Sequence, residues 1–253
     1  MSLTGQSGTG KIRLFHDFCG PELPIAGTTV VGASGGGMFK IGPFKITGST
    51  TDTDAGIVAL EKESGYARIS ASATTDADSM AIGTDLCFSP LLNGTLVLEC
   101  RVENYSVLTL RNIFIGFCGL NEDEINEPLT SATTTITYVT PCVGFHLDST
   151  INNPTYWHMP YLLASTATQL ETAVLSSQVA VAGESDVLRV EIDPNGAARW
   201  YINGKLEQSV GAGLAATTTT KLCGIASIFG KTTTAASMDI DYLLVEANRD
   251  WTR

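Results

Sequence analysis

Hydrophobic and polar side chains alternate along most of this chain. Over residues 95–103, the even positions from Leu96 to Val102 are apolar and the odd positions are mostly charged. A period of two is typical of a β-strand with one buried face. Similar short runs, separated by clusters of Gly, Asn, Asp, Pro and Thr, predict further strands at 12–18, 56–60, 66–71, 113–118, 143–147, 187–192, 198–202, 222–229 and 238–245.

The clearest local prediction is a three-stranded meander over residues 187–207. Apolar and charged residues alternate up to residue 192, and Asp-Pro-Asn-Gly at 193–196 then provides the residues that a tight turn favours. The chain returns through 198–202 and reaches Asn203-Gly204, the dipeptide most typical of a two-residue hairpin turn. The third strand is therefore expected to start at residue 205.

Helical patterns are weak in this sequence. Residues 121–127 and 169–176 are the only helix candidates, and both are short. Many short strands with turn residues between them predict an all-β protein, either a sandwich or a barrel. The length of 253 residues fits one large β domain or two smaller ones.

Three segments resemble the concanavalin A-like (laminin G-like) superfamily, which includes lectins and glucanases. VLRVEIDPNGAARWYINGKLE at 187–207 resembles its late meander, FHDFCGP at 15–21 its opening D-F-x-G-P motif, and MDIDYLLV at 238–245 its closing strand. The resemblance implies an antiparallel β-sandwich, a jelly roll, whose first and last strands are neighbours. Because it spans both ends of the chain, it also implies one domain over 12–253. Residues 1–11 are expected to form a flexible N-terminal arm, and 119–141, where the resemblance is not seen, an insertion or long loops.

The net charge and the spacing of the cysteines argue against several classes of function. The net charge is −11, so the chain lacks the basic surface that nucleic acids or anionic membranes require. We see no signal peptide and no apolar run of membrane-spanning length. The six cysteines include no C-x-x-C pair, which disfavours a zinc site. Without a secretory signal we expect reduced thiols, and three disulfides are the alternative.

No segment predicts catalysis. Gly5–Lys11 matches part of a P-loop, but Ile12 replaces the Ser or Thr that holds magnesium, and we expect a flexible arm instead. The glucanases of the superfamily carry an E-x-D-x-x-E or E-x-D-x-E signature, which is absent. Asp239 and Asp241 come nearest, and simple alternation places them on a strand face that continues with apolar residues. We therefore predict a protein without enzymatic activity.

The three histidines give no sign of a catalytic site. His16, His146 and His158 lie far apart in the sequence, and no serine or cysteine nucleophile is recognisably paired with a base. His146 alternates with the apolar residues of its predicted strand, so we expect it at the surface or hydrogen-bonded within the fold.

Two groups of residues are candidate binding sites. Alternating carboxylates at Asp52, Asp54, Asp76 and Asp78 could hold calcium, with turn-forming aspartates as the default interpretation. No other cofactor is indicated. Residues 156–161 form the densest aromatic cluster. Tyr156, Trp157 and Tyr161 could stack on sugar rings, although a place in the core or in an oligomer contact is favoured.

The absence of an export signal in a protein that resembles extracellular β modules favours a virion component made in the host cytoplasm. Sandwiches similar to this superfamily recur among phage head-decoration and tail proteins. We therefore expect a capsid decoration or tail-appendage protein that binds capsid or other virion proteins and forms homo-oligomers. Lys11, Trp251 and Arg253 near the two ends are the candidate interface residues. A carbohydrate-binding module for host glycans is the alternative, and a glucanase-type enzyme is the third hypothesis.

Overall fold

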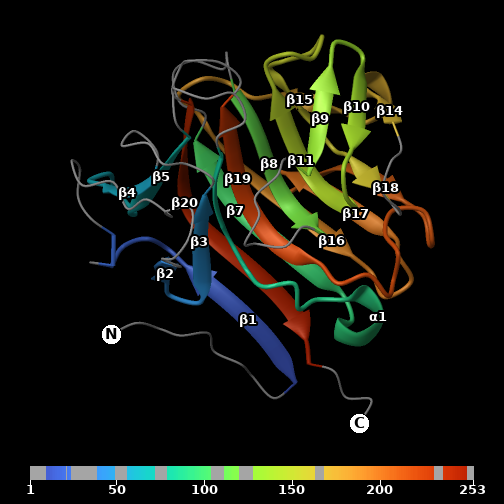
Figure 1. Cartoon of the computed structure of the whole chain (residues 1–253), viewed down its shortest axis with the longest axis horizontal. Coiled ribbons are helices and arrows are strands. Elements are labelled where there is room, and N and C mark those ends of the chain that lie inside the picture. Colours follow the sequence, from blue (N-terminus) through green and yellow to red (C-terminus); the bar gives the residue numbers. More distant parts are fainter. Residues whose placement is uncertain are drawn as a thin grey trace.

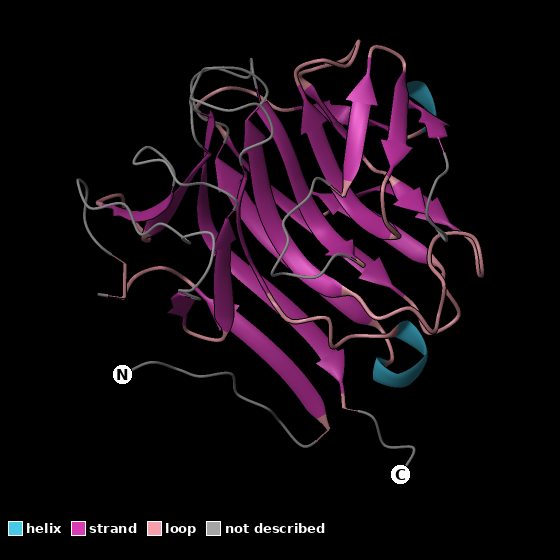
Figure 2. Ribbon diagram, viewed as in Figure 1, coloured by secondary structure: helices cyan, strands magenta, loops and turns pink. Residues whose placement is uncertain are grey.

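Two large antiparallel sheets face each other in the computed structural model, which describes residues 10–20, 22–23, 39–48, 56–71, 79–103, 111–119, 128–162, 168–230 and 236–249 (Figure 1). Almost every regular element is a strand (Figure 2). The fold is an antiparallel β-sandwich. A short helix, α1 (Pro90–Asn93), and a 3₁₀ turn, η1 (Glu171–Ala173), complete the described elements.

Sheet A has eight strands and joins the two ends of the described chain. Its order is β18 (Lys205–Val210), β17 (Ala198–Ile202), β16 (Ser185–Ile192), β7 (Leu96–Glu103), β20 (Ala236–Asn248), β5 (Tyr66–Ala71) and β4 (Gly56–Leu60). The eighth strand, β1 (Lys11–His16), pairs with the second half of β20, with Lys11 opposite Asn248. The first and last strands are neighbours, as the resemblance implied.

Sheet B has nine strands and forms the second layer. Its order is β15 (Leu175–Val179), β12 (Tyr156–His158), β11 (Cys142–Asp148), β8 (Arg111–Cys118), β19 (Cys223–Gly230), β6 (Ser79–Gly83), β3 (Phe44–Gly48) and β2 (Phe39–Ile41), and β13 (Tyr161–Leu162) pairs with β11. A separate three-stranded sheet, the cap sheet, has the order β14 (Thr168–Leu170), β10 (Thr135–Tyr138) and β9 (Leu129–Ala132).

The main core lies between sheets A and B. Alternate residues of each strand point into it, including Leu98 and Val190 from sheet A and Ile115 and Phe145 from sheet B, all fully buried. Cys100 shares this face, as its spacing predicted. These residues remove a large apolar area from water, which is the main term that favours folding.

A second apolar cluster lies on the other face of sheet B. Phe114, Cys118 and Phe229 occupy the alternate positions of β8 and β19, and they pack against Ile136 and Tyr138 of the cap sheet. The cap sheet therefore forms a partial third layer over the outer face of sheet B. This explains why all eight residues of β8 are buried.

The predicted strands are all present, with ends shifted by a few residues. The meander is confirmed as β16, β17 and β18, and its turns use positive φ angles at Gly196, Asn203 and Gly204. The helix predicted at 169–176 is wrong, because this segment contains the end of β14, the turn η1 and the start of β15. The candidate at 121–127 lies outside the described residues. Within 119–141, β9 and β10 form a hairpin.

The expected facing of Asp239 and Asp241 is also wrong. The pairing of β20 with β7 shifts between Ile240 and Tyr242, which marks a bulge at this point. Ile240 and Leu243 both point into the main core as a result. The two aspartates therefore do not share a face with Leu243, as simple alternation had predicted.

Candidate functional site

The layer between sheet B and the cap sheet contains a buried serine–histidine pair. His146 of β11 is 0% exposed, and its Nε2 lies 2.7 Å from Ser131 Oγ of β9. Its Nδ1 lies 3.1 Å from the carbonyl oxygen of Ile113, so Nδ1 carries the proton and Nε2 accepts a hydrogen bond from the Ser131 hydroxyl. The pair fastens the cap sheet to sheet B, and His146 is hydrogen-bonded within the fold.

A second buried histidine connects sheet B to the 3₁₀ turn that follows the cap sheet strand β14. His158 Nε2 of β12 lies 3.3 Å from Glu171 Oε2 in η1, and Asn153 Nδ2 donates to both oxygens of that carboxylate at 2.9 Å. Burial lowers the pKa of His158, and the opposing hydrogen bond and charge of Glu171 do not fully compensate. The imidazole is therefore favoured in its neutral form, with Nε2–H donating to Glu171.

The Ser131–His146 pair was missed by the sequence analysis, because its members lie in different strands. A hydroxyl beside a neutral imidazole is the arrangement of nucleophile and base in hydrolases. Here the imidazole has no exposed surface and lies between two packed layers. We therefore interpret the pair as a structural connection between β9 and β11 rather than a reacting group.

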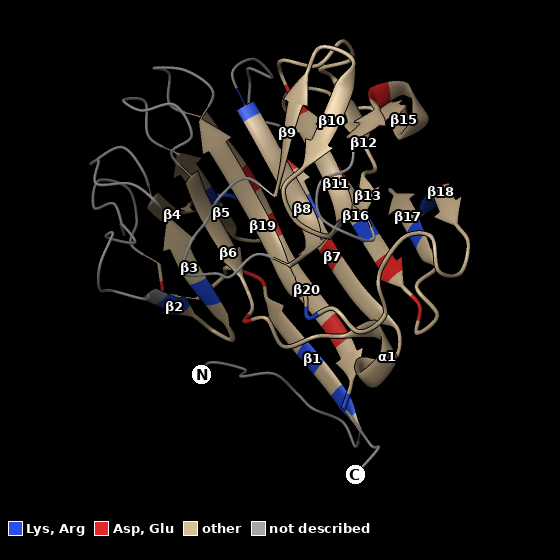
Figure 3. Ribbon diagram, turned by 45° about the vertical axis from the view of Figure 1, so that its right-hand side comes forward, with Lys and Arg blue, Asp and Glu red and all other residues tan. Residues whose placement is uncertain are grey.

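Basic and acidic residues recur along the strands of sheet A (Figure 3), and many of them form ion pairs. Asp239 is 0% exposed and accepts hydrogen bonds from Arg68 Nε at 2.7 Å, Arg68 Nη2 at 2.9 Å and Lys62 Nζ at 3.0 Å. Asp241 accepts a hydrogen bond of 2.6 Å from Arg101 Nη1. Both carboxylates are therefore paired with cationic side chains of neighbouring segments.

The ion pairs continue across neighbouring strands. Arg189 of β16 contacts Glu99 of β7 at 3.1 Å and Glu191 at 2.8 Å, and Arg199 of β17 contacts Glu191 at 3.1 Å. Tyr242 donates its hydroxyl to Glu99 at 2.8 Å. Burial, followed by this hydrogen bond, raises the Tyr242 pKa, so the phenol stays protonated. The charged residues of β7 are thus all paired with charged partners.

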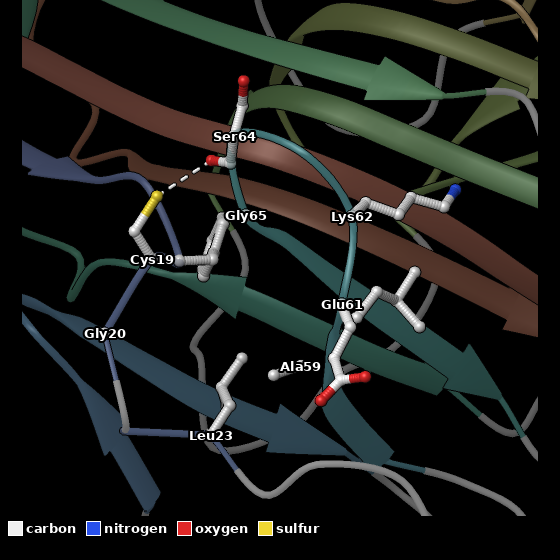
Figure 4. A pocket seen from close by; sticks show the side chains of 10 residues that line it. Cys19, Gly20, Leu23, Ala59, Glu61, Lys62, Ser64 and Gly65 are labelled. Carbon is white, nitrogen blue, oxygen red and sulfur yellow. Dashed lines mark hydrogen bonds between the residues drawn. The ribbon is translucent and has the colours of Figure 1, made fainter.

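A hollow of about 560 Å³ lies where the segment after β1 meets the β4–β5 turn (Figure 4). Cys19 donates its thiol hydrogen to the Ser64 carbonyl oxygen at 2.9 Å, and Leu23 and Ala59 add apolar surface. Burial, with smaller contributions from Asp17 and Asp241, raises the Cys19 pKa and disfavours the reactive thiolate. The hollow is therefore lined by both apolar and charged side chains, because Glu61 and Lys62 also border it.

The aromatic cluster at 156–161 does not form an exposed sugar platform. Trp157 is 0% exposed, and its Nε1–H donates to Asp186 of sheet A at 2.9 Å. Tyr161 packs against Trp200, with their ring centroids 5.8 Å apart. The sugar-stacking role considered for Trp157 is therefore wrong, because neither face of its ring is free. Tyr156 is half-buried.

Most of the other candidate residues lie outside the part of the chain that the structure describes. Asp52, Asp54, Asp76 and Asp78 lie outside the described residues, as do Trp251 and Arg253. Lys11 is exposed at the start of β1 and lines a hollow of about 470 Å³ with Arg13 and Glu246. Within the described ranges, no three His, Cys, Asp or Glu side chains are arranged to hold a metal ion, and no helix is long and apolar enough to cross a membrane.

No family model matches the sequence, and no curated protein matches it. Solved structures do match the fold. A protein of unknown function from Shewanella oneidensis MR-1 is 14% identical, with a TM-score of 0.57, over 100% of this chain and 92% of the other. An endo-1,3-β-glucanase from Streptomyces sioyaensis is 14% identical, with a TM-score of 0.52, over 96% of this chain and 99% of the other.

The chain has the concanavalin A-like jelly-roll fold. A third similar structure, the cellulose-induced protein Cip1, is 10% identical, with a TM-score of 0.50, over 79% of this chain and 90% of the other. At such low identity the likeness concerns the fold alone, because one fold supports many functions.

Proposed function

We propose that this chain is a non-enzymatic structural protein of a virus particle, either a capsid decoration protein or a component of a tail appendage. It acts through contacts with capsid or other virion proteins and with copies of itself. It is made in the host cytoplasm and is located on the particle.

The contacts made within both broad faces of the sandwich carry this proposal. The second apolar cluster and the cap sheet cover part of the outer face of sheet B. The outer face of sheet A carries side chains that are already paired with each other, such as Arg68 with Asp239. We therefore expect recognition to use strand edges and loops.

Apolar side chains on three edge strands support protein–protein contact. Leu170 of β14 is 61% exposed, Val179 of β15 is 42% exposed and Leu206 of β18 is 49% exposed. Each of these strands is one edge of its sheet, and the three lie on one side of the molecule (Figure 1). Exposed edges with apolar residues are sites where another chain can bind.

The test is whether the chain sediments with particles assembled from the genome that encodes it. We expect the chain in purified particles at stoichiometric amounts, and we expect light scattering to show an oligomer in solution. The double substitution Val179→Lys and Leu206→Lys should weaken both associations. Leu91→Lys, at a 56%-exposed position on α1, is the matched control and should leave them unchanged. A monomer that does not associate with particles would contradict the proposal.

The predicted interface near the chain ends can be tested in the same assay. Lys11 lies at the start of β1, opposite Asn248 near the end of β20. We expect Trp251→Ala and Lys11→Ala to reduce association with particles, since aromatic and basic side chains often contribute strongly to interfaces. Retention of full association in both variants would place the contact elsewhere, and the edge-strand variants would then identify it.

A glycan-binding module is the rival hypothesis, because a solved structure with this fold is a glucanase. The burial of Trp157 removes the strongest aromatic candidate for such a site. A glycan array should therefore give no specific signal with this chain. Binding that is lost in Tyr156→Ala would instead favour the lectin hypothesis over the structural one.

A further inference from the structure

Three cysteines form a row across adjacent strands on the outer face of sheet B. Cys118 of β8 is directly opposite Cys142 of β11 on one side and directly opposite Cys223 of β19 on the other. All three belong to the second apolar cluster, and each is at most 1% exposed. They are far apart in the sequence, so only the sheet register brings them together.

The middle thiol is closest to one of its neighbours. Cys118 Sγ and Cys223 Sγ lie 3.6 Å apart. Directly opposed residues of an antiparallel pair have Cα atoms about 4.5–5.5 Å apart, which lies within the usual range of a disulfide. The sulfurs therefore need to approach by only about 1.5 Å to reach the bonding distance of about 2.05 Å, without a rearrangement of the strands.

We propose that Cys118 and Cys223 are an oxidation site that forms a cross-strand disulfide when the folded protein meets a small peroxide. One sulfur attacks a peroxide oxygen, the O–O bond breaks, and a sulfenic acid and water form. The second sulfur then displaces the hydroxyl group as water, and the S–S bond forms. Two thiols and one hydrogen peroxide thus give one disulfide and two waters, with two electrons passing from sulfur to oxygen.

The strand order excludes a disulfide between Cys142 and Cys223. Cys142 and Cys223 are separated by β8, hence by two strand spacings of about 4.8 Å each. Two cysteines whose Cα atoms are more than about 7 Å apart cannot be bridged without backbone movement. Cys118 is therefore required for any disulfide within the row, and Cys142 is its alternative partner.

Burial determines how the reaction proceeds. Burial raises the pKa of Cys142, and its neighbour Cys118 adds to this effect, so Cys142 stays protonated. A small neutral oxidant can enter the packed layer more readily than a large or charged one. We expect slow oxidation that joins β8 to β19. This inference goes beyond the proposed function and does not depend on it.

The experiment uses the full chain with Cys19→Ser and Cys87→Ser, because these two thiols are exposed to the oxidant and to other copies of the chain. After treatment with hydrogen peroxide, the remaining thiols are alkylated in denaturant and the disulfides are mapped by mass spectrometry. We expect a Cys118–Cys223 linkage, with Cys100 and Cys142 alkylated. The unfolding midpoint should rise by roughly 5–10 °C and return on reduction, because the bond closes a long loop.

Single substitutions provide the matched controls in the same background. Cys142→Ala should retain the linkage, whereas Cys118→Ala and Cys223→Ala should abolish it. If one of these variants folds poorly, the disulfide map of the protein that retains all three cysteines still decides the question. A Cys118–Cys142 linkage, or three thiols that remain reduced after prolonged treatment of the folded protein, would overturn the proposal.

Discussion

Trp157 of sheet B donates its indole N–H to Asp186 of sheet A across the main core, at 2.9 Å. A second tryptophan makes the reverse connection, because Trp200 of sheet A donates to the carbonyl oxygen of Gly144 in sheet B at 2.8 Å. Each indole satisfies a buried polar group of the opposite sheet. The two hydrogen bonds therefore fix how the sheets sit on each other, in addition to the apolar area that the rings bury.

Trp157→Phe should destabilise the protein by about 1–3 kcal/mol, because it removes the donor to Asp186 and leaves a small cavity. Chemical denaturation monitored by circular dichroism measures this change. Tyr156→Phe is the matched control in the same strand, and it should change the free energy of unfolding by less than about 0.5 kcal/mol. Equal stability of the two variants would show that the indole hydrogen bond contributes nothing.

Gly116→Ala should destabilise the protein by about 3 kcal/mol or more. Gly116 and Gly144 face each other in β8 and β11, and a Cβ added at Gly116 would lie 2.4 Å from the Gly144 Cα and 2.5 Å from the Val143 carbonyl oxygen. Backbone atoms of a central strand cannot move away without disturbing the sheet. The free energy of unfolding from denaturant titration tests this expectation.

Gly211→Ala is the control for this substitution. The nearest atom to its added Cβ is Leu214 Cδ1 at 3.8 Å, which is an ordinary contact. Its stability should stay within about 1 kcal/mol of the wild type. If Gly116→Ala were equally well tolerated, the close approach of β8 and β11 would be wrong.

Asp239→Asn should destabilise the protein by about 1–3 kcal/mol, because it weakens charge-assisted hydrogen bonds to Arg68 and Lys62 at a fully buried position. Thermal unfolding at constant pH gives the measurement. Arg13→Met is the control, since the Arg13–Glu246 ion pair is exposed and such pairs contribute little. A greater loss in Arg13→Met than in Asp239→Asn would contradict this assignment.

Acidification should destabilise the fold through His158. Its pKa in the folded protein is lowered from the ordinary 6.5 by burial, so the unfolded chain binds a proton first as the pH falls. The free energy of unfolding should therefore decrease from about pH 7 to about pH 5. His158→Gln should show a shallower dependence over this range, measured by denaturant titration at each pH. An unchanged slope in the variant would exclude His158 as the group responsible.

The sequence predicted the strands well because alternation and turn residues act locally. The cap sheet was not predicted, since the threonine-rich residues 129–138 show no strong apolar period. One signal of the second cluster was present. Residues 113–115 are Ile-Phe-Ile, an uninterrupted apolar run that indicates burial on both faces of a strand. A cover over sheet B could have been inferred from it.

The surface features were less predictable, because they depend on pairings between distant residues. Arg68 and Asp239 are 171 positions apart, and the bulge in β20 changes which residues share a face. Likewise, Ser131 and His146 meet only because β9 folds back over β11. Such contacts follow from register and layer order, which single-sequence patterns do not contain.

The position of β20 within sheet A affects how the protein is made in the cell. This strand holds β7 on one side and β5 and β1 on the other, yet it is the last of the described strands in chain order. Its three partners must wait with unpaired edges until residues 236–248 emerge. Sheet A can therefore be completed only late in synthesis, and until then the edges of its earlier strands are open to pairing with other chains.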